Sequence, residues 1–573
     1  NIDTLGNFLL INAEIERIKT SGINFELNTI LTKEIFENIK EKYDAVVIGG
    51  GITGAGIALD AATRGMKVAL LEMQDFAAGT SSRSTKLIHG GLRYLKQLEV
   101  KMVADVGKER AIVFSNGPHV TTPEWMLLPF YEDGTFGPRT TSLGLKVYDI
   151  LAGVEKDERR HMLSAHEVLE KEPLIKREGL KGGGYYVEYR TDDARLTTEV
   201  IKKAAEFGAE VINYTKVTQF LYDEGQLRAA VIDDRMTGKT SIVHGRKFIN
   251  AAGPWVDELR EMDQSKDKKT LQLTKGVHIV IDQSCFPLQQ AVYFDTEDGR
   301  MVFAIPRDGK VYVGTTDTFY NDAPICPIAT AEDRAYLLNA IRFIFPQAVV
   351  TDEDIESSWA GVRPLILEEG KDPSEISRKD EIWLSQSGLV TIAGGKLTGY
   401  RKMAEKVVDL LADQFKKEKY KLFDECCTKT LPIAGGDVGG PEHWQEFMKQ
   451  AIIQGLEVGL TKEEAEAICK LYGSNCVKVF KLIRENPEEM KKYGFSKEVY
   501  GKLKYAIEYE MIATPVDFFY RRTGALLFNI AWVQEWKEKV TAYMSSAFGW
   551  SAEREKAIRN ELEKAIVIAV NPQ

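Results

Sequence analysis

The strongest chemical signal in this 573-residue chain is a strand that leads into a glycine-rich turn. The apolar run Asp44-Ala-Val-Val-Ile48 is followed directly by Gly49-Gly-Gly51-Ile-Thr-Gly54, a Gly-x-Gly-x-x-Gly pattern. The first glycine of such a pattern permits a tight turn, the second lets the backbone approach a pyrophosphate, and the third lets helix and strand pack closely. The N-terminus of the following helix offers free N–H groups and a positive dipole end to phosphates.

A carboxylate follows at the distance that ribose recognition needs. A small-residue helix over residues 55–64 leads to a second apolar strand that ends at Glu72, 21 residues after Gly51. A carboxylate at this place can bind ribose hydroxyls. An isolated glycine pattern is often only a turn, but here strand, helix, second strand and acid occur in register. The sequence therefore predicts a dinucleotide site at Gly49, Gly51, Gly54 and Glu72.

Two later segments bear on which dinucleotide is bound. Phe248-Ile-Asn-Ala-Ala-Gly253-Pro-Trp255 is a strand that ends in small residues, where backbone can pass close to a ligand. Leu389-Val-Thr-Ile-Ala-Gly394-Gly395-Lys396-Leu-Thr398 is a buried strand that opens a helix through two glycines. The dipole of that second helix N-terminus would favour an anionic reduced flavin. Each segment alone is also typical of an ordinary strand end, but together with the first motif they favour FAD over NAD.

The elements that must position these residues fall into three parts. We expect a helical N-terminal extension over residues 1–42, a FAD-binding domain interleaved with a substrate-binding cap over 43–424, and a helical domain over 425–573. Alternating patterns near residues 292–294, 301–305 and 310–313 predict antiparallel strands with one exposed face. The C-terminal part has helical periodicity over residues 441–472, with a capping box at Thr461 and Glu464 and a stop at Gly473.

Composition narrows the class of protein. Hydrophobic residues make up 44% and charged residues 28% of the chain, which is typical of an ordinary globular protein with several cores. The formal net charge of −10 argues against a nucleic-acid binder, although it allows a local basic pocket. Six cysteines without a Cys-x-x-Cys pair suggest neither a disulfide framework nor a metal site. No signal peptide or membrane-spanning run is apparent, so we expect a cytoplasmic protein.

A set of further motifs, in order along the chain, resembles the aerobic, FAD-dependent glycerol-3-phosphate dehydrogenases over residues 43–528. These motifs are Gly79-Thr-Ser-Ser-Arg-Ser-Thr-Lys-Leu-Ile-His89-Gly-Gly-Leu-Arg93-Tyr94, Asp192-Asp-Ala-Arg195, Asn250-Ala-Ala-Gly-Pro-Trp255, Thr274-Lys-Gly-Val-His278, Gly314-Thr-Thr-Asp317, Gly361-Val-Arg363-Pro-Leu365, Ser377-Arg378 and Gly394-Gly-Lys396-Leu-Thr398. The resemblance implies an α/β fold in which a two-dinucleotide-binding FAD domain interleaves with an antiparallel-sheet substrate cap, followed by a helical domain.

The resemblance also implies an activity and a set of site residues. The activity is oxidation of sn-glycerol 3-phosphate to dihydroxyacetone phosphate by hydride transfer to FAD, with electrons passed to a quinone. The implied substrate-binding residues are Arg93, Tyr94, Arg363, Arg378 and Lys396. Beyond the glycine turn and Glu72, the implied FAD contacts are Thr80, Ser81, Ser82, His89, Gly90, Gly253, Gly395, Leu397 and Thr398.

The residue types agree with what this reaction needs. A phosphomonoester requires fixed cations, for which Arg363, beside Pro364, is better placed than Arg378 in its charged loop. His278 lies inside an apolar strand and is our preferred base for the hydroxyl proton, although a core histidine is the alternative. His89 is the rival base, or a residue that tunes the flavin. Arg363 and Lys396 are also expected to stabilise the developing alkoxide.

Two other patterns are interpreted as structural. Thr237-Gly-Lys-Thr240 looks like the end of a P-loop, but Asp233 stands where the first glycine is needed, so a turn between strands is favoured. Asp192 and Asp193 suggest catalytic carboxylates, but a helix N-cap is favoured there.

Three other functions remain open at this stage. The nearest is a glycerophosphate oxidase that uses oxygen, but oxidases of this family carry a long insertion between the Arg-Pro-Leu and Ser-Arg segments, which lie only 15 residues apart here. A non-catalytic flavin-binding module and an NAD-dependent reductase are more remote. A homodimer is left open.

Use of a quinone requires contact with a membrane surface, which we expect to be peripheral and at the inner face of the cell membrane. Basic and aromatic residues suited to that contact are Lys96, Lys101, Trp125, Phe519, Tyr520, Arg521 and Arg522.

Overall fold

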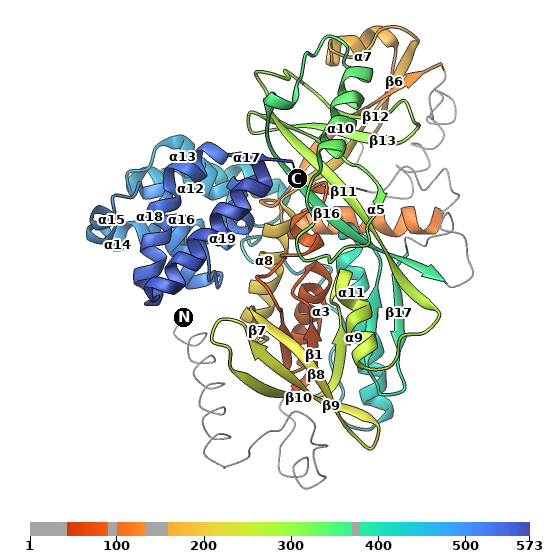
Figure 1. Cartoon of the computed structure of the whole chain (residues 1–573), viewed down its shortest axis with the longest axis vertical. Helices are drawn as coiled ribbons and strands as arrows, with labels where there is room; N and C mark the ends of the chain where they lie inside the picture. The colour runs from red at the N-terminus through yellow and green to blue at the C-terminus, as the bar shows by residue number, and fades with distance from the viewer. Residues whose placement is uncertain (1–42, 90–99, 133–158, 369–378, 573) are drawn as a thin grey trace.

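The computed structural model of the chain describes residues 43–89, 100–132, 159–368 and 379–572. Two sheets are stacked end to end in Figure 1, and a group of helices lies beside them. The predicted N-terminal helix lies outside the described residues, as do Gly90, Arg93, Tyr94 and Arg378.

The first sheet has a parallel core with the strand order β17-β18-β10-β1-β2-β7. The central strand β1 (Tyr43–Ile48) is buried along its whole length. It pairs in parallel with β2 (Val68–Leu71) on one side and with β10 (Thr240–Asn250) on the other. Strand β10 continues in parallel to β18 (Val390–Ala393). The edge strands are β7 (Glu210–Ile212) and β17 (Glu381–Leu384).

Helices cover this sheet and follow its strands. Helix α3 (Ile52–Thr63) comes directly after β1 and packs between α8 (Asp193–Glu206) and α11 (Tyr400–Lys417). Helix α3 is nearly all small or aliphatic residues, which allows this close packing. The carboxyl ends of β1, β10 and β18 therefore lie side by side, where open α/β sheets bind their ligands.

Strands β8 (Thr215–Asp223) and β9 (Gln226–Asp234) extend β10 as an antiparallel ribbon. The segment around Gly238 is the turn between β9 and β10. The prediction of a turn between strands, rather than a P-loop, is confirmed.

The second sheet is largely antiparallel. Its strand order is β15-β11-β14-β13-β12-β4-β6-β3, with β16 paired to β11 and β5 paired to β6. Its strands are β3 (Leu87–Ile88), β4 (Thr121–Tyr131), β5 (His161–Leu163), β6 (Leu180–Thr191), β11 (Lys269–Asp282), β12 (Ala291–Asp295), β13 (Met301–Arg307), β14 (Lys310–Gly314), β15 (Thr318–Phe319) and β16 (Ile355–Glu368).

The antiparallel arrangement of β12, β13 and β14 confirms the prediction, but the expected exposed face is wrong. Phe294, Val302 and Val313 pack with helix α10 (Ala331–Ile344) in one apolar cluster. Tyr293 and Tyr312, on the opposite face, belong to another cluster that includes a residue from the C-terminal helices. Both faces of these strands are covered, and alternation along each strand therefore separates two buried surfaces.

The chain passes repeatedly between the two sheets. Strands β1 and β2 lie in the first sheet, β3 to β6 in the second, β7 to β10 in the first, β11 to β16 in the second, and β17 and β18 in the first. The predicted interleaving of a FAD domain with an antiparallel cap is therefore confirmed.

The C-terminal part is helical and forms its own apolar core. Its principal helices are α12 (Trp444–Glu457), α13 (Lys462–Tyr472), α14 (Cys476–Glu485), α15 (Pro487–Tyr493), α16 (Lys497–Tyr509), α17 (Ala525–Phe528), α18 (Ile530–Phe548) and α19 (Ala552–Val570). The predicted capping box at Thr461 and Glu464 starts α13, and Gly473 ends it. The domain boundary near residue 425 stays a prediction.

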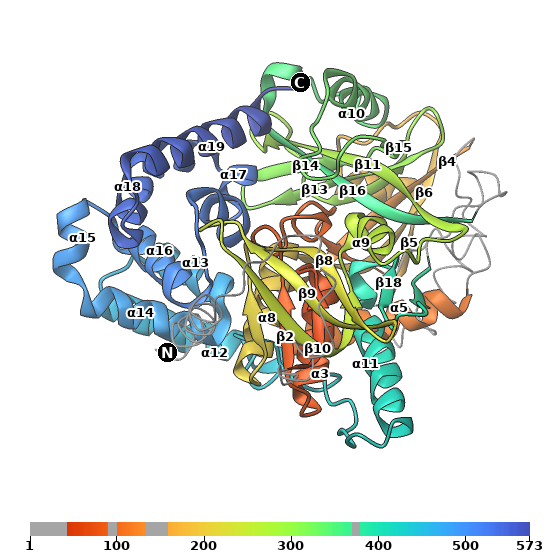
Figure 2. The same ribbon diagram turned by 60° about the horizontal axis from the view of Figure 1, so that its bottom comes forward.

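These helices are anchored on the cap sheet. The end of α19 reaches α10, where Arg334 Nη2 donates to the Val570 carbonyl over 2.5 Å. Figure 2 shows α19 running toward that end of the molecule.

Candidate functional site

The glycine turn after β1 is held by contacts that exclude any side chain. Gly49 has a φ of +116°, and a Cβ on it would lie 2.4 Å from the Ala251 carbonyl oxygen. A Cβ on Gly54 would lie 1.9 Å from the Gly49 carbonyl oxygen. Strand β1, the end of β10 and helix α3 therefore meet backbone to backbone, as a pyrophosphate-binding turn requires.

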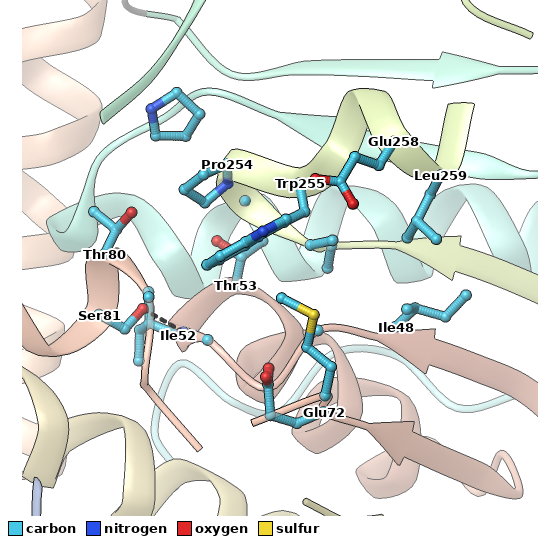
Figure 3. A pocket seen from close by; sticks show the side chains of 18 of the residues that line it. Ile48, Ile52, Thr53, Glu72, Thr80, Ser81, Pro254, Trp255, Glu258 and Leu259 are labelled. Atoms are coloured by element: carbon cyan, nitrogen blue, oxygen red, sulfur yellow. Dashed lines mark hydrogen bonds between the residues drawn. The ribbon is translucent and has the colours of Figure 1, made fainter. Parts of the chain in front are cut away.

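The N-terminus of α3 opens into a cavity. Gly51 is the N-cap of this helix, and the Ile52 backbone N–H donates to Ser81 Oγ over 2.9 Å, the contact drawn in Figure 3. Ser81 belongs to the short helix η1 (Thr80–Ser82). Thr80 Oγ1 donates to the Val362 carbonyl over 2.6 Å, which ties η1 to β16 of the cap sheet.

Glu72 lies at the end of β2, beside the glycine turn. Its carboxylate accepts hydrogen bonds from the backbone N–H of Gly50 at 2.7 Å and of Gln74 at 2.8 Å. Burial raises the pKa of Glu72 to about 6 in spite of these bonds. The carboxylate is thus fixed in place next to the cavity.

This first cavity has a volume of about 320 Å³. Among the residues expected to contact FAD, it is lined by Gly49, Gly51, Glu72, Thr80, Ser81, Gly253, Gly395 and Leu397. The Trp255 indole extends into it from η3 (Gly253–Trp255), as Figure 3 shows. Sequence reasoning missed this side chain, although Trp255 closes one of the motifs.

A second cavity of about 440 Å³ lies against the cap sheet. It shares a wall with the first, formed by residues from η1, from β16 and from the loop after β18. The shared residues are Thr80, Ser84, Pro364, Gly395, Lys396 and Leu397. A ligand that fills the first cavity can therefore meet one that fills the second.

Arg363 projects from β16 at the second cavity. Its Nη2 donates to Thr315 Oγ1 over 2.7 Å, and its Nη1 lies 3.5 Å from Asp317 Oδ1. A Cβ on Gly276 would lie 2.2 Å from Arg363 Nη2, so a glycine is needed opposite the guanidinium. The arginine is 29% exposed and held from two sides, which suits it to bind an anion.

His278 projects from β11 next to Arg363. Its Nε2 lies 3.0 Å from Thr85 Oγ1, and its ring stacks on Trp359 with centroids 4.6 Å apart. A Cβ on Gly314 would lie 2.2 Å from the ring. Burial, followed by the charges of Arg363 and Lys86, holds the pKa of His278 well below its usual range. The imidazole is therefore neutral near pH 7.

His89 and the segment after β18 meet at the other side of this cavity. The His89 N–H donates to Thr398 Oγ1, and Thr398 Oγ1 donates to the His89 carbonyl, both over 3.1 Å. Burial and the charge of Lys396 lower the pKa of His89 to about 3. Gly395 has a φ of +86° and packs on Met403 of α11. The short helix η6 (Leu397–Gly399) lies between Gly395 and the start of α11.

The structure brings most of the predicted site residues to these two joined cavities. The exceptions among described residues are Gly54, which packs behind the turn, and Ser82, which is fully buried. Sequence reasoning did not single out other side chains that line the second cavity. They include Arg83 just after η1, Tyr293 and Phe303 on β12 and β13, Arg300 just before β13, and Asp317 between β14 and β15.

Two further sequence predictions, the N-cap at Asp192 and the membrane contact, have different outcomes. Asp192 is the N-cap of α8 and accepts from the Arg195 N–H over 3.0 Å, which confirms that prediction. The expected membrane contact at residues 519–522 is wrong, because Phe519, Arg521 and Arg522 are buried. Trp125 is only partly exposed and stacks on Tyr185 with centroids 4.6 Å apart. Lys96 lies outside the described residues, and the side chain of Lys101 is not among those described.

No helix in the described part of the chain is both long enough and apolar enough to span a membrane.

The turn, the acidic residue and the adjoining cavities define a dinucleotide-binding oxidoreductase of the flavin-dependent class. The family model for FAD dependent oxidoreductases matches residues 44–401. The model for the C-terminal domain of alpha-glycerophosphate oxidase matches residues 426–555.

Comparison with individual proteins narrows the class. The aerobic glycerol-3-phosphate dehydrogenase of Bacillus subtilis strain 168 is 61% identical over 533 residues, which cover 93% of this chain and 96% of the relative. The enzyme of the same name from Staphylococcus epidermidis strain RP62A is 58% identical and covers 94% of this chain and 97% of its own. The chain belongs to the family of aerobic, FAD-dependent glycerol-3-phosphate dehydrogenases.

Solved structures agree with this assignment. The glycerol-3-phosphate dehydrogenase from Bacillus halodurans complexed with FAD has a TM-score of 0.82 and 49% identity, covering 94% of this chain and 97% of its own. The L-alpha-glycerophosphate oxidase from Mycoplasma pneumoniae with FAD bound has a TM-score of 0.54 and 20% identity, covering 65% of this chain and 95% of its own, and it supports the fold alone.

Proposed function

We propose that this chain oxidises sn-glycerol 3-phosphate to dihydroxyacetone phosphate and passes the electrons to a quinone. The observation that carries the proposal is the shared wall of the two cavities, because it joins the FAD site to a cavity that holds a neutral histidine and an anchored arginine. The names of the relatives supply the substrate.

The residues present fit FAD. Gly49 and Gly54 leave no room for a side chain, so backbone can approach the pyrophosphate, and the N-terminus of α3 with Ser81 faces the phosphates. The fixed carboxylate of Glu72 is placed for ribose hydroxyls. Gly395, in the loop before η6, and Leu397, its first residue, lie where the two cavities join and would hold the flavin end. FAD supplies a hydride acceptor when it is bound.

The phosphate of the substrate would be bound by cations on the cap side. Arg363 is oriented by Thr315 and Asp317, and Lys396 lies on the shared wall. We propose that both bind the substrate and stabilise the developing alkoxide. Arg93, Tyr94 and Arg378 remain proposed substrate-binding residues, and the two arginines are proposed for the phosphate.

His278 is the proposed general base. The hydroxyl proton of the substrate would pass to the imidazole, and the carbon that bears this hydroxyl would lose a hydride to the acceptor that bound FAD supplies, so that the alcohol becomes a ketone. The low pKa of His278 keeps the ring unprotonated, and its contacts with Thr85 and Trp359 hold the ring in one orientation. His89 also has a lowered pKa, but its proposed role is contact with FAD.

Anaerobic spectroscopy tests this function. Addition of glycerol 3-phosphate to the purified yellow protein is expected to bleach the flavin absorbance, and the His278→Asn variant is expected to bleach about 10²–10⁴ times more slowly. No bleaching of the native protein would contradict the proposed substrate. Equal rates in both proteins would contradict the role of His278 and leave the substrate standing.

The acceptor requires its own test. We propose a quinone because Arg363 and Arg378 lie only 15 residues apart, without the long insertion expected of the oxidases. Oxidation of the substrate-reduced protein is expected to be faster with a soluble quinone analogue than with air. A stoichiometric burst of hydrogen peroxide under air, without a quinone, would instead identify an oxidase.

A peripheral contact with the inner face of the cell membrane, in a cytoplasmic protein, is part of this proposal. Co-sedimentation with anionic vesicles at low salt, and its loss at high salt, is the expected result. The homodimer stays a prediction that analytical ultracentrifugation can decide.

A further inference from the structure

A closed cluster of ion pairs lies where the C-terminal helices meet the FAD-binding sheet. It contains four acidic and four basic side chains, and none of them is more than 12% exposed. The acids are Asp75, Glu199, Glu510 and Asp517, and the bases are Arg195, Lys202, Arg521 and Arg522. None of the eight lines either cavity, so the proposed chemistry leaves them unexplained.

Asp75 brings this cluster to the nucleotide site. It lies three residues after Glu72, in the loop that wraps the glycine turn. Within this loop Glu72 accepts from the Gly50 N–H over 2.7 Å, and the Ala77 N–H donates to the Gly50 carbonyl over 3.0 Å. The position of Gly50 therefore depends on where this loop lies.

Two successive arginines bind the Asp75 carboxylate. Arg521 Nε donates to Oδ2 over 2.5 Å, and Arg522 donates to both oxygens over 2.8 Å. Burial raises the pKa of Asp75, but Arg522 and Arg521 outweigh it and lower the value to about 2. The carboxylate is thus ionised and accepts three hydrogen bonds from these two guanidiniums.

The two arginines that share this carboxylate are neighbours in the chain. Residues i and i+1 of an α-helix do not face each other. Here they stand at the end of a π-helix, η9 (Asp517–Arg522), a rare conformation that is frequent at functional sites. Arg522 also donates to the Glu510 carbonyl over 2.7 Å, and Arg195 of α8 donates to the Arg522 carbonyl over 2.8 Å.

The same π-helix contacts the second cavity. The Arg83 guanidinium, which lines that cavity, lies 5.8 Å from the centre of the Tyr520 ring. A Cβ on Gly361 would lie 2.3 Å from the Arg83 carbonyl oxygen, so the backbone of this segment is packed against β16. Helix η9 therefore touches one segment from each cavity.

We propose that η9 is a clamp on the FAD site, in which Arg521 and Arg522 hold the Glu72–Ala77 loop through Asp75. These three residues are positioning residues that slow the release of FAD. Docking of the C-terminal helices and binding of FAD are then linked, and each strengthens the other by the same factor. The proposal rests on FAD as cofactor and does not depend on the substrate or the acceptor.

The release of FAD from holoenzyme measures the clamp directly. The Asp75→Asn variant removes the charge of the carboxylate that Arg521 and Arg522 share, so the loop is expected to loosen. After dilution of the purified holoenzyme, the rise of free flavin fluorescence is expected to be about tenfold faster than in the native protein.

A matched control separates loosening of the loop from general destabilisation. Asp60 is also fully buried and pairs with an arginine, Arg64, at 2.6 Å, but it lies at the far end of α3 from the phosphates. Asp60→Asn is expected to lower the thermal unfolding temperature while FAD release stays within about twofold of native. Equal rates of FAD release in the Asp75→Asn and Asp60→Asn variants would overturn the proposal.

A milder variant and a second readout guard against failure to fold. Arg522→Lys keeps the charge but loses the two-pronged contact with Asp75, and it is expected to speed FAD release in the same direction. In the native protein, amide hydrogen exchange of residues 517–522 is expected to slow when FAD is bound. Exchange that is the same with and without FAD would count against the linkage. Failure of glycerol 3-phosphate to bleach the flavin would leave both results unchanged.

Discussion

The two joined cavities are built from different parts of the polypeptide. At its glycine turn the first cavity, the proposed FAD site, is bounded by backbone: glycines that admit no Cβ, a helix N-terminus and one carboxylate held by N–H groups. The second cavity is formed by charged and aromatic side chains from an antiparallel sheet. Backbone contacts suit a cofactor that stays bound, whereas side chains from several strands can fit a particular substrate. Substitutions at the first cavity should therefore change FAD binding, whereas substitutions at the second should change binding and oxidation of the substrate while FAD stays bound.

The largest effect is expected from a side chain added to the FAD turn. A Cβ on Gly54 would lie 1.9 Å from the Gly49 carbonyl oxygen, so Gly54→Val is expected to abolish FAD binding. The ratio of flavin to protein absorbance after purification measures this. Gly65→Asn is the control, because a Cβ at Gly65 meets no atom within 4 Å and asparagine tolerates its φ of +84°. A yellow Gly54→Val protein would contradict the backbone account of this cavity.

The next-largest effect is expected from substitution of His278, which should slow reduction of the flavin while FAD stays bound. Because its pKa lies well below the usual range, the unprotonated base persists as the pH falls. The rate of flavin reduction in the native protein is therefore expected to stay constant from about pH 8 to pH 6.5, the usual histidine pKa. Stopped-flow reduction at each pH checks this. A rate that has fallen by about half at pH 6.5 would show that the base has the pKa of an ordinary exposed histidine.

A smaller effect is expected from Arg363→Lys. The charge is kept, but the two-sided contact with Thr315 and Asp317 is lost, so substrate binding is expected to weaken by about 2 kcal/mol, or roughly thirtyfold in KM. Steady-state kinetics with an artificial acceptor measure this. Lys406→Arg is the control, since Lys406 pairs with Asp380 at the surface. An unchanged KM would remove Arg363 from the substrate cavity.

The smallest effect is expected at Glu72, the one carboxylate of the FAD cavity held by backbone N–H groups at the turn. Its pKa of about 6 in the folded chain lies above the value of 4.5 for an unburied glutamate, so the FAD-free protein loses stability as the pH rises through this window. The loss is at most about 2 kcal/mol. Glu72→Gln should remove it, so the variant is expected to unfold at a higher temperature than the native apoprotein at pH 7.5 but not at pH 4.5.

The same variant should bind FAD about tenfold more weakly, because a neutral amide replaces the carboxylate proposed for the ribose hydroxyls. A stability difference that does not change with pH would contradict the role of ionised Glu72. Unchanged FAD affinity would contradict its contact with the ribose.

The sequence predicts the FAD cavity better than its surroundings because that cavity depends on local patterns. Gly49, Gly51 and Gly54 belong to one turn, and the spacing to Glu72 follows from one strand–helix–strand unit. His278 and Arg363 could be named because of the family motifs, but their contacts with Trp359 and Thr315 depend on the pairing of distant strands. Gly276 and Gly314 are needed only because these side chains lie against them.

The error at residues 519–522 shows where such prediction fails. Aromatic residues followed by two arginines are typical of a surface that contacts a membrane. Their partner Asp75 lies 446 residues from Arg521 in the chain, so nothing near them indicates that the charges are paired and buried. The exposed face expected of β12 to β14 failed for a similar reason, since α10 and the C-terminal helices that cover these strands come later in the chain.

The interleaving of the two sheets has a consequence for synthesis of the chain. Strand β1 ends at Ile48, but its partner β10 begins only at Thr240. The next partner, β18, which pairs with β10, begins only at Val390. At about 5–20 residues per second, a ribosome needs on the order of 10–40 s to deliver β10 after β1. During that time a strand that is fully buried in the native fold lacks one neighbour, and its edge is open to other chains. Nascent chains of this fold should therefore depend on chaperones, and shortened chains that end before residue 390 should aggregate.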